Sequence, residues 1–172
     1  MKTLTQQLSQ YAAYHRDRRN IVSHFVGIPM IVLAATILLA RPSFGIAGLP
    51  VSPAEIAAVV LTLYYLKLDL RYGIAMGAFL AACLAIAGDV TGMDGTTWLI
   101  WGVGLFVAGW IIQFVGHIFE GRKPAFFDDV MGLAIGPLFV MAEAGFLLGL
   151  RRDVQRAMAA QPAGFTAESA AP

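Results

Sequence analysis

From Thr96 to Phe119 the chain has no Asp, Glu, Lys or Arg, and this stretch also holds all three of its tryptophans. A helix needs about 20 residues to cross the hydrocarbon layer of a bilayer, and this stretch is longer than that. Tryptophan near the end of such a span suits the membrane interface. The stretch therefore predicts a transmembrane helix and argues against a water-soluble fold.

Four more apolar segments are candidate spans: Ile21–Ala40, Leu49–Leu66, Tyr72–Gly88 and Val130–Leu150. The second and third of these have a very short connection, which predicts a helical hairpin. Gly73 and Gly77 form a small-xxx-small pair that favours close helix packing. The last segment carries Pro137 and Glu143, so it either crosses the membrane or enters and returns. The sequence predicts an all-α, multi-pass transmembrane helix bundle with four to five spans.

Residues 1–20 are polar and basic, with one apolar stripe at helical spacing. The stripe consists of Leu4, Leu8, Tyr11 and His15. This pattern predicts an N-terminal amphipathic interfacial helix, which lies on the membrane surface or against the bundle. We expect a single membrane-embedded helical domain over residues 1–150 and a polar, flexible tail over residues 151–172.

Composition excludes several classes of function. Charged residues make up 13% of the chain and hydrophobic residues 58%, whereas an ordinary soluble domain is roughly 25% charged. The 12 Lys and Arg residues barely exceed the 11 Asp and Glu residues. Because this leaves no basic excess for a phosphate backbone, no nucleic-acid partner is expected. Cys83 is the single cysteine, which excludes an intramolecular disulfide and a cysteine-built zinc site.

Basic residues gather on one side of the predicted bundle. If the N-terminus is cytoplasmic, the cytoplasmic loops of the first four spans hold Lys2, Arg16, Arg18, Arg19, Lys67, Arg71, Arg122 and Lys123. The opposite side then holds only Arg41. The positive-inside rule predicts this orientation, in a bacterial inner membrane or, for a eukaryotic chain, in the endoplasmic reticulum. The arginines after residue 150 reach the same side only if the fifth segment returns.

The chain has three histidines, and the predicted topology brings all of them to the cytoplasmic interface: His15, His24 and His117. Asn20 lies four residues before His24, so these two side chains share a helix face. Gln113, His117 and Glu120 share a face in the same way. A histidine and a carboxylate one turn apart are a usual pair of metal ligands in helix bundles. The spacing therefore makes metal binding a candidate function.

A shared site for His15 and His24 requires a break in the helix, because side chains at this separation point in opposite directions on an unbroken helix. We predict the break between Arg18 and Asn20. The alternative for each histidine is an ordinary hydrogen-bonded side chain with no catalytic role. Glu143 also leaves two interpretations open, a functional residue or a structurally paired one. A carboxylate deep in a bilayer costs about 2.5–3.5 kcal/mol on insertion scales, so it is protonated, paired or lines a polar cavity.

Two longer motifs contain the histidines. They are Tyr14-His15 followed by Asn20, His24 and Gly27-Ile28-Pro29, and Gln113-x-x-Gly116-His117-x-x-Glu120-Gly121-Arg122-Lys123-Pro124-Ala125. On these motifs the chain resembles the small membrane family of 2-hydroxy fatty acid dioxygenases, over about residues 5–150. The yeast member of that family acts in the alpha-oxidation step of phytosphingosine breakdown.

The resemblance implies an Fe(II)-dependent dioxygenase in a lipid bilayer. Its partners are a 2-hydroxy fatty acid and O2, and its products are CO2 and a fatty acid shorter by one carbon. Neutral imidazoles suit Fe(II), and the expected iron ligands are His15, His24 and His117. Glu120 is expected to be a fourth ligand or an acceptor for an imidazole N–H. Asn20 and Gln113 are expected to orient ligands or bound oxygen species, and Glu120 is expected to be a catalytic residue together with them. The basic residues Arg19, Arg122 and Lys123 are expected to attract the substrate carboxylate.

Two other functions stay open at this stage. Two histidines in a bundle also suit a b-type haem protein. A non-enzymatic membrane scaffold or small transporter is the second alternative, because ionisable residues and interrupted helices mark transport paths. A histidine-rich di-iron desaturase is excluded, since three histidines cannot supply its ligand set. Histidine and carboxylate ligands suit zinc as well as iron, so the identity of the metal rests on the resemblance.

Overall fold

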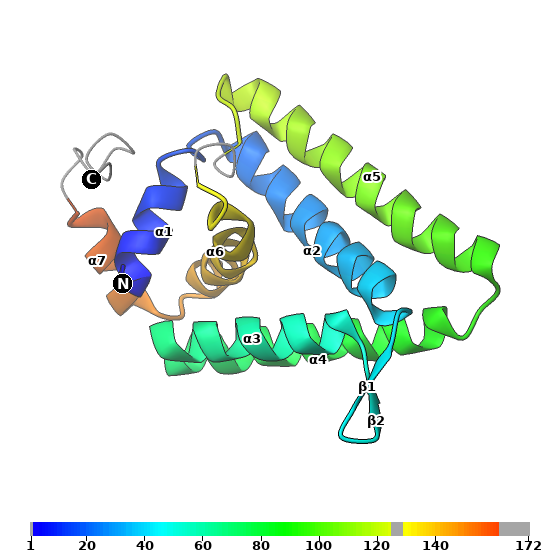
Figure 1. Ribbon diagram of the computed structural model, residues 1–172. Helices are drawn as coiled ribbons and strands as arrows, with labels where there is room; N and C mark the ends of the chain where they lie inside the picture. The colour runs from blue at the N-terminus through cyan, green and yellow to red at the C-terminus, as the bar shows by residue number, and fades with distance from the viewer. Residues whose placement is uncertain (1, 125–128, 162–172) are drawn as a thin grey trace. The chain divides into compact units, whose positions relative to one another are not determined.

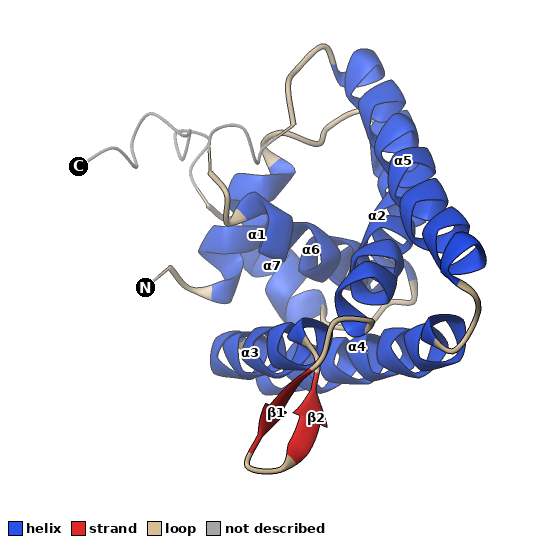
Figure 2. Cartoon of the chain, turned by 45° about the vertical axis from the view of Figure 1, so that its right-hand side comes forward, coloured by secondary structure: helices blue, strands red, loops and turns tan. Residues whose placement is uncertain are grey.

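The computed structural model describes residues 2–124 and 129–161, and within these ranges the fold is all-α with one small β-hairpin (Figures 1 and 2). The helices are α1 (Leu4–Ala12), α2 (Arg18–Ala40), α3 (Pro53–Leu68), α4 (Leu70–Thr91), α5 (Gly95–Glu120), α6 (Gly132–Leu147) and α7 (Arg152–Ala159). The strands are β1 (Phe44–Ile46) and β2 (Leu49–Val51). The helical fold class predicted from the sequence is confirmed.

Close contacts group the described residues into two compact units. Unit 1 comprises residues 2–25 and the described residues from 113 onward, and unit 2 comprises residues 26–112. The helices α2 and α5 each contribute one end to unit 1 and the remainder to unit 2. Every candidate site residue named above lies in unit 1, so the site can be described within a single unit.

Three helices in the described ranges are long and apolar enough to cross a membrane, namely α2, α4 and α5. The pair α6 and α7, bent by 111°, makes a fourth if it is counted as one span. Helix α3 has 16 residues, which corresponds to about 24 Å against a hydrocarbon layer of about 30 Å. These helices fit a multi-pass membrane protein.

The predicted second span begins later than expected. Leu49–Val51 is not helical but pairs as β2 with β1, in antiparallel register. The two-residue turn between the strands contains Ala47 and Gly48, with φ of 51° and 82°. Two positive φ angles are the geometry of a tight hairpin turn. Helix α3 then starts at Pro53, behind the capping residue Ser52, because proline suits the first helical position.

The predicted hairpin of the second and third spans is confirmed by the packing of α3 on α4. A Cβ atom at Gly73 would lie 2.5 Å from the Cα atom of Leu66, so only glycine allows this approach. A Cβ atom at Gly77 would lie 3.0 Å from Thr62 Cγ2. The two glycines therefore bring the helices together, as their spacing predicts.

In unit 1, the amphipathic N-terminal helix is α1. Its N-terminus has a capping box in which Thr3 and Gln6 satisfy each other's main-chain N–H groups. It buries Leu4, Leu8 and Tyr11 of the predicted apolar stripe, whereas His15 lies beyond its end, and it packs against α6 and α7. The helix ends at Ala12 and α2 begins at Arg18. The predicted break is therefore present, but its position was wrong: it precedes Arg18, because the Asp17 carboxylate caps the new helix by accepting the Arg19 N–H at 2.8 Å.

The fifth apolar segment is broken as well. Helix α6 contains Pro137 and ends at Leu147, and α7 follows after a turn with positive φ at Gly149 and Arg151. The bend of 111° between α6 and α7 is that of a broken span or a re-entrant loop. Part of the predicted polar tail is thus helix α7, while residues 162–172 lie outside the described residues.

Candidate metal centre

The three histidines converge in the interior of unit 1. His15 lies in the connection between α1 and α2, His24 in the second turn of α2, and His117 in the last turn of α5. Their exposed fractions are 3%, 2% and 6%. One nitrogen from each ring can be chosen so that the three atoms lie within 4.8 Å of one another. Separations of this order bring three imidazoles around one small ion.

Main-chain carbonyl groups fix the orientation of the rings. Nδ1 of His15 donates to the carbonyl oxygen of Tyr11 at 2.8 Å, and Nδ1 of His24 donates to the carbonyl oxygen of Asn20 at 2.8 Å. A carbonyl oxygen only accepts, so in both residues the proton sits on Nδ1 and Nε2 keeps its lone pair. The ring of His117 is held by a hydrogen bond to the backbone of Arg122. Such outer hydrogen bonds are the usual support of metal-binding histidines.

Two of the imidazole nitrogens in the centre lack a hydrogen-bond partner. Nε2 of His15 and Nδ1 of His117 are buried and make no hydrogen bond. A buried polar atom left in this state costs about 1–3 kcal/mol. Burial lowers the pKa of His15 to about 4, because the charged form loses its hydration. The ring is therefore neutral at pH 7, as a metal ligand must be.

Two buried amides accompany the histidines. Asn20 is 0% exposed and Gln113 is 4% exposed. Neither polar atom of the Gln113 side chain has a hydrogen-bond partner, and Oδ1 of Asn20 has none. Gln113 lies one turn before His117 on the same face of α5. The interior of unit 1 thus holds polar atoms that protein groups leave unsatisfied, beside the three imidazoles.

The carboxylate of Glu120 faces the start of α2. It accepts the main-chain N–H of Arg16 at 2.9 Å and of Asp17 at 2.8 Å, and Nδ2 of Asn20 donates to it at 3.1 Å. A negative charge at a helix N-terminus is favourable because the unsatisfied N–H groups carry partial positive charge. Among the described residues the group that fits a metal consists of the three histidines and does not include Glu120.

The three basic residues predicted to attract substrate lie at the surface near the same ends of α2 and α5. Arg19 pairs with Asp17 at 2.8 Å, and its guanidinium carbon lies 4.4 Å from the centre of the Phe119 ring. The hydrogen bond from Arg19 lowers the pKa of Asp17 to about 2. Arg122 donates to the carbonyl oxygen of Ala13 at 3.3 Å. Lys123 is exposed. Glu143 is half-buried on α6.

Sequence reasoning missed two aromatic residues at the centre. The Tyr11 ring stacks on the His15 ring, with centroids 4.2 Å apart and an angle of 7° between the planes. Phe139 of α6 lies 5.0 Å from Tyr11 and 5.8 Å from His15, measured between ring centroids. The spacing of four between Tyr11 and His15 was a usable signal, whereas nothing in the sequence connects Phe139 to α1.

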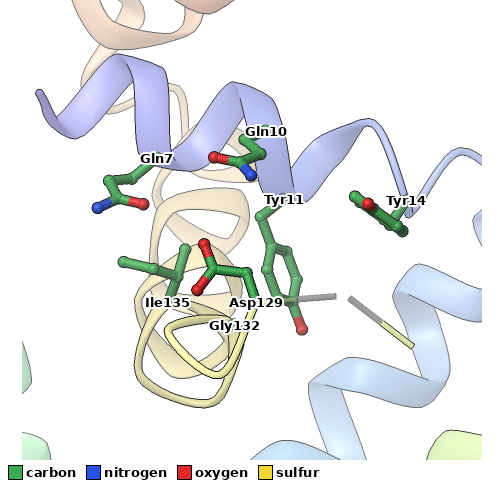
Figure 3. A pocket seen from close by; sticks show the side chains of 7 residues that line it. All are labelled: Gln7, Gln10, Tyr11, Tyr14, Asp129, Gly132 and Ile135. Carbon is green, nitrogen blue, oxygen red and sulfur yellow. The ribbon is translucent and has the colours of Figure 1, made fainter. Parts of the chain in front are cut away.

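A small cavity lies beside Tyr11 (Figure 3). Its volume is about 20 Å³, which is room for about one water molecule. The residues that line it come from α1 and the connection after it, and from the start of α6 and the residues before it: Gln7, Gln10, Tyr11, Tyr14, Asp129, Gly132 and Ile135. Tyr11 therefore lines this cavity and also stacks on His15.

Comparison with known proteins agrees with the chemistry of this centre. Residues 1–148 match the profile of a family described as 2-hydroxy-palmitic acid dioxygenase Mpo1-like. The 2-hydroxy-palmitic acid dioxygenase MPO1 of Saccharomyces cerevisiae is 33% identical over 149 residues, which cover 85% of this chain and 82% of the yeast protein. No solved structure matches the chain.

Proposed function

The chain belongs to the 2-hydroxy-palmitic acid dioxygenase Mpo1-like family, and from this premise we propose that it is an Fe(II)-dependent dioxygenase of 2-hydroxy fatty acids. The proposed iron ligands are His15, His24 and His117. The observation that carries the proposal is the pair of buried imidazole nitrogens without a hydrogen-bond partner. A metal ion would satisfy both atoms, and neutral imidazoles are ligands that suit Fe(II).

The reaction balances without another reductant. A 2-hydroxy acid R–CH(OH)–COOH and one O2 give R–COOH, CO2 and H2O, so the bond between C1 and C2 breaks and C2 becomes the new carboxyl carbon. When bound, iron supplies open coordination positions for the hydroxy acid and for O2. Only the acid and O2 are consumed, in agreement with the word dioxygenase in the name of the yeast relative.

The side chains around the histidines have separate proposed roles. Gln113 has a free donor and a free acceptor in the interior, and we assign it to orient the substrate head group or bound oxygen. Asn20 supports His24 through its carbonyl oxygen and contacts Glu120 through its side chain. Glu120 acts by positioning these groups, since its oxygens are taken by N–H donors. The surface cations Arg19, Arg122 and Lys123 attract the substrate carboxylate from the interface.

The membrane setting suits this substrate. The chain of a fatty acid favours the apolar phase, while its carboxylate and 2-hydroxyl group favour the interface. The histidines lie at the ends of α2 and α5, two helices that are long enough to span a bilayer. We propose that this end faces the cytoplasm, because the topology predicted from the sequence puts most of the basic loop residues on that side.

Elemental analysis of anaerobically purified protein in mild detergent is the first test. About one iron per chain is expected, followed by O2 uptake and release of a one-carbon-shorter acid when 2-hydroxypalmitate and air are added. His117→Ala is expected to lose the metal while the helix content stays unchanged. Ile118→Ala is the matched control, because Ile118 is 75% exposed and points away from the centre. Full iron content and activity in His117→Ala would reject the ligand assignment.

The alternatives predict other outcomes. A haem would give a Soret band, but the centroids of the three imidazole rings lie only 4.3–5.2 Å apart, which is too close for two of the rings to stand on opposite faces of a porphyrin. The transporter alternative has one supporting observation, the break between α6 and α7 with Glu143 on α6. Protein that holds no metal after anaerobic handling, yet is stabilised by a ligand, would favour the transporter. Zinc without O2 uptake would indicate hydrolytic chemistry instead.

A further inference from the structure

Tyr11 makes two separate contacts with His15. Its carbonyl oxygen accepts the Nδ1 proton at 2.8 Å, and its ring lies parallel to the imidazole at a centroid distance of 4.2 Å. The first contact fixes which nitrogen carries the proton. The second fixes the plane in which the other nitrogen lies. Together they leave the His15 ring little freedom to rotate.

His15 needs this support more than the other two histidines do. His24 and His117 project from continuous helices, whose backbone sets the direction of each side chain. His15 lies in the connection between α1 and α2, where no helix sets the direction of its side chain. Its ring position depends on packing against neighbours, and Tyr11 supplies the closest aromatic neighbour at a centroid distance of 4.2 Å.

Aromatic side chains also contact His15 and His24. Tyr11 and Phe139 cover one side of His15, and Tyr11 meets His24 edge-on with centroids 6.4 Å apart. Tyr11 also lines the cavity, which has room for about one water molecule. The unsatisfied amide atoms of Gln113 belong to α5 instead. Aromatic rings of α1 and α6 therefore pack against His15, and one of them, that of Tyr11, belongs to a residue that also lines the cavity.

We infer that Tyr11 is a positioning residue for the metal centre: its ring fixes the plane of the His15 imidazole. The inference rests on the proposed metal site and adds a residue to it. The stack requires a flat ring and does not require the phenol hydroxyl. Tyr11→Phe therefore preserves the function of the residue, and Tyr11→Leu removes it.

Cobalt titration of the full chain in detergent tests the inference without turnover. Co(II) reports its coordination through its visible absorption, and the wild-type chain is expected to bind it with a spectrum of imidazole ligation. Loss of outer support around a metal ligand typically weakens binding by about 10–100-fold, which is the expected effect of Tyr11→Leu. Tyr11→Phe is expected to keep the wild-type affinity and spectrum.

Leu8→Ala is the matched control, because Leu8 is a fully buried residue of α1 whose side chain has no aromatic ring to stack on a histidine. It loosens the packing of α1, and it is expected to leave the cobalt spectrum unchanged. Equal loss of affinity in Leu8→Ala and Tyr11→Leu would overturn the inference in favour of general docking of α1. Wild-type affinity in Tyr11→Leu would also overturn it. A wild-type chain that binds no Co(II) would instead reject the metal centre.

Turnover of the iron-loaded chain separates positioning from chemistry. If Tyr11 acts only through its ring, Tyr11→Phe keeps both kcat and KM for 2-hydroxypalmitate. A large fall in kcat with unchanged cobalt binding in Tyr11→Phe would show that the hydroxyl takes part in the reaction, which contradicts the inference.

Discussion

The side chain of Glu120 accepts the main-chain N–H of Arg16 with both oxygens, at 2.9 and 3.0 Å, although 104 positions separate the two residues. Arg16 directly follows His15, and Glu120 lies three residues after His117. One carboxylate therefore links the two chain segments that carry these histidines. The same carboxylate holds the Asn20 side chain, and the Asn20 carbonyl oxygen holds His24.

Glu120→Ala is expected to weaken metal binding more than it weakens the fold. Hydrogen bonds to charged groups contribute about 1.5–3 kcal/mol each, and partial replacement by water leaves an expected loss of about 2–3 kcal/mol in stability. Co(II) affinity is expected to fall at least about 10-fold because the His15 connection is released. Cobalt titration and thermal unfolding measure the two effects.

Glu55→Ala is the control for Glu120→Ala. Glu55 also accepts main-chain and hydroxyl hydrogens, from Ser52 at the start of α3, but it belongs to unit 2. It is expected to lower stability and to leave the Co(II) affinity unchanged. Wild-type cobalt affinity in Glu120→Ala would mean that His15 is held without this carboxylate.

Gly116→Ala is expected to disrupt the centre although it adds only a methyl group. A Cβ atom there would overlap Ser23 Oγ and lie 2.6 Å from Asn20 Oδ1, so α2 and α5 must separate. Overpacking of this kind costs about 1–3 kcal/mol. Gly104→Ala in the same helix is the control, since a Cβ atom at Gly104 meets nothing within 4 Å. Alanine is the better helix former by about 1 kcal/mol, so Gly104→Ala is expected to hold or raise the melting temperature.

Most of the predictions from the sequence that agree with the structure came from the uncharged stretches and from the spacing of the histidines. Long apolar segments are sufficient to specify helices in a bilayer, and residues four apart share a helix face whatever surrounds them. These rules explain why Gln113 and His117 were placed together correctly on α5. The small-residue pair Gly73 and Gly77 likewise predicted a close contact that depends only on local shape.

The features that sequence reasoning missed depend on contacts between distant segments. The hydrogen bonds of Glu120 to the N-terminal end of α2 were not predicted, while its expected contact with an imidazole or a metal stays a prediction. Phe139 reaches His15 only because α6 packs on α1. The β-hairpin was missed because Leu49 and Val51 are as apolar as a span, and only the turn at Ala47 and Gly48 distinguishes them.

Removal of the metal is expected to lower the stability of the protein. A ligand that binds only the folded state at 100 times its dissociation constant stabilises it by about 2.7 kcal/mol. Treatment with a chelator is therefore expected to lower the melting temperature in detergent, and added Fe(II) or Co(II) is expected to restore it. His117→Ala serves as the control and is expected to melt at the same temperature with and without chelator. If the chelator leaves the melting temperature of the wild-type chain unchanged, the proposal that the chain binds a metal is contradicted.

The path of the chain after α5 predicts that both ends of the described chain lie on the same side of the membrane. Helix α1 has 9 residues, a length of about 14 Å, and it contacts both α6 and α7. A helix that crossed the bilayer would carry α7 to the opposite surface, out of reach of α1. The bend of 111° instead lets α6 enter and the chain return.

Cysteine labelling in sealed vesicles tests this topology, because Cys83 is the single native cysteine. In a Cys83→Ser background, Arg16→Cys, Phe44→Cys and Arg156→Cys place one thiol each at exposed positions. Phe44 lies in the hairpin that follows α2, so its thiol is expected on the side opposite Arg16. A membrane-impermeant maleimide is expected to label the thiols at positions 16 and 156 from one side and the thiol at position 44 from the other. If position 156 is labelled together with position 44, α6 crosses the membrane and the re-entrant path is rejected.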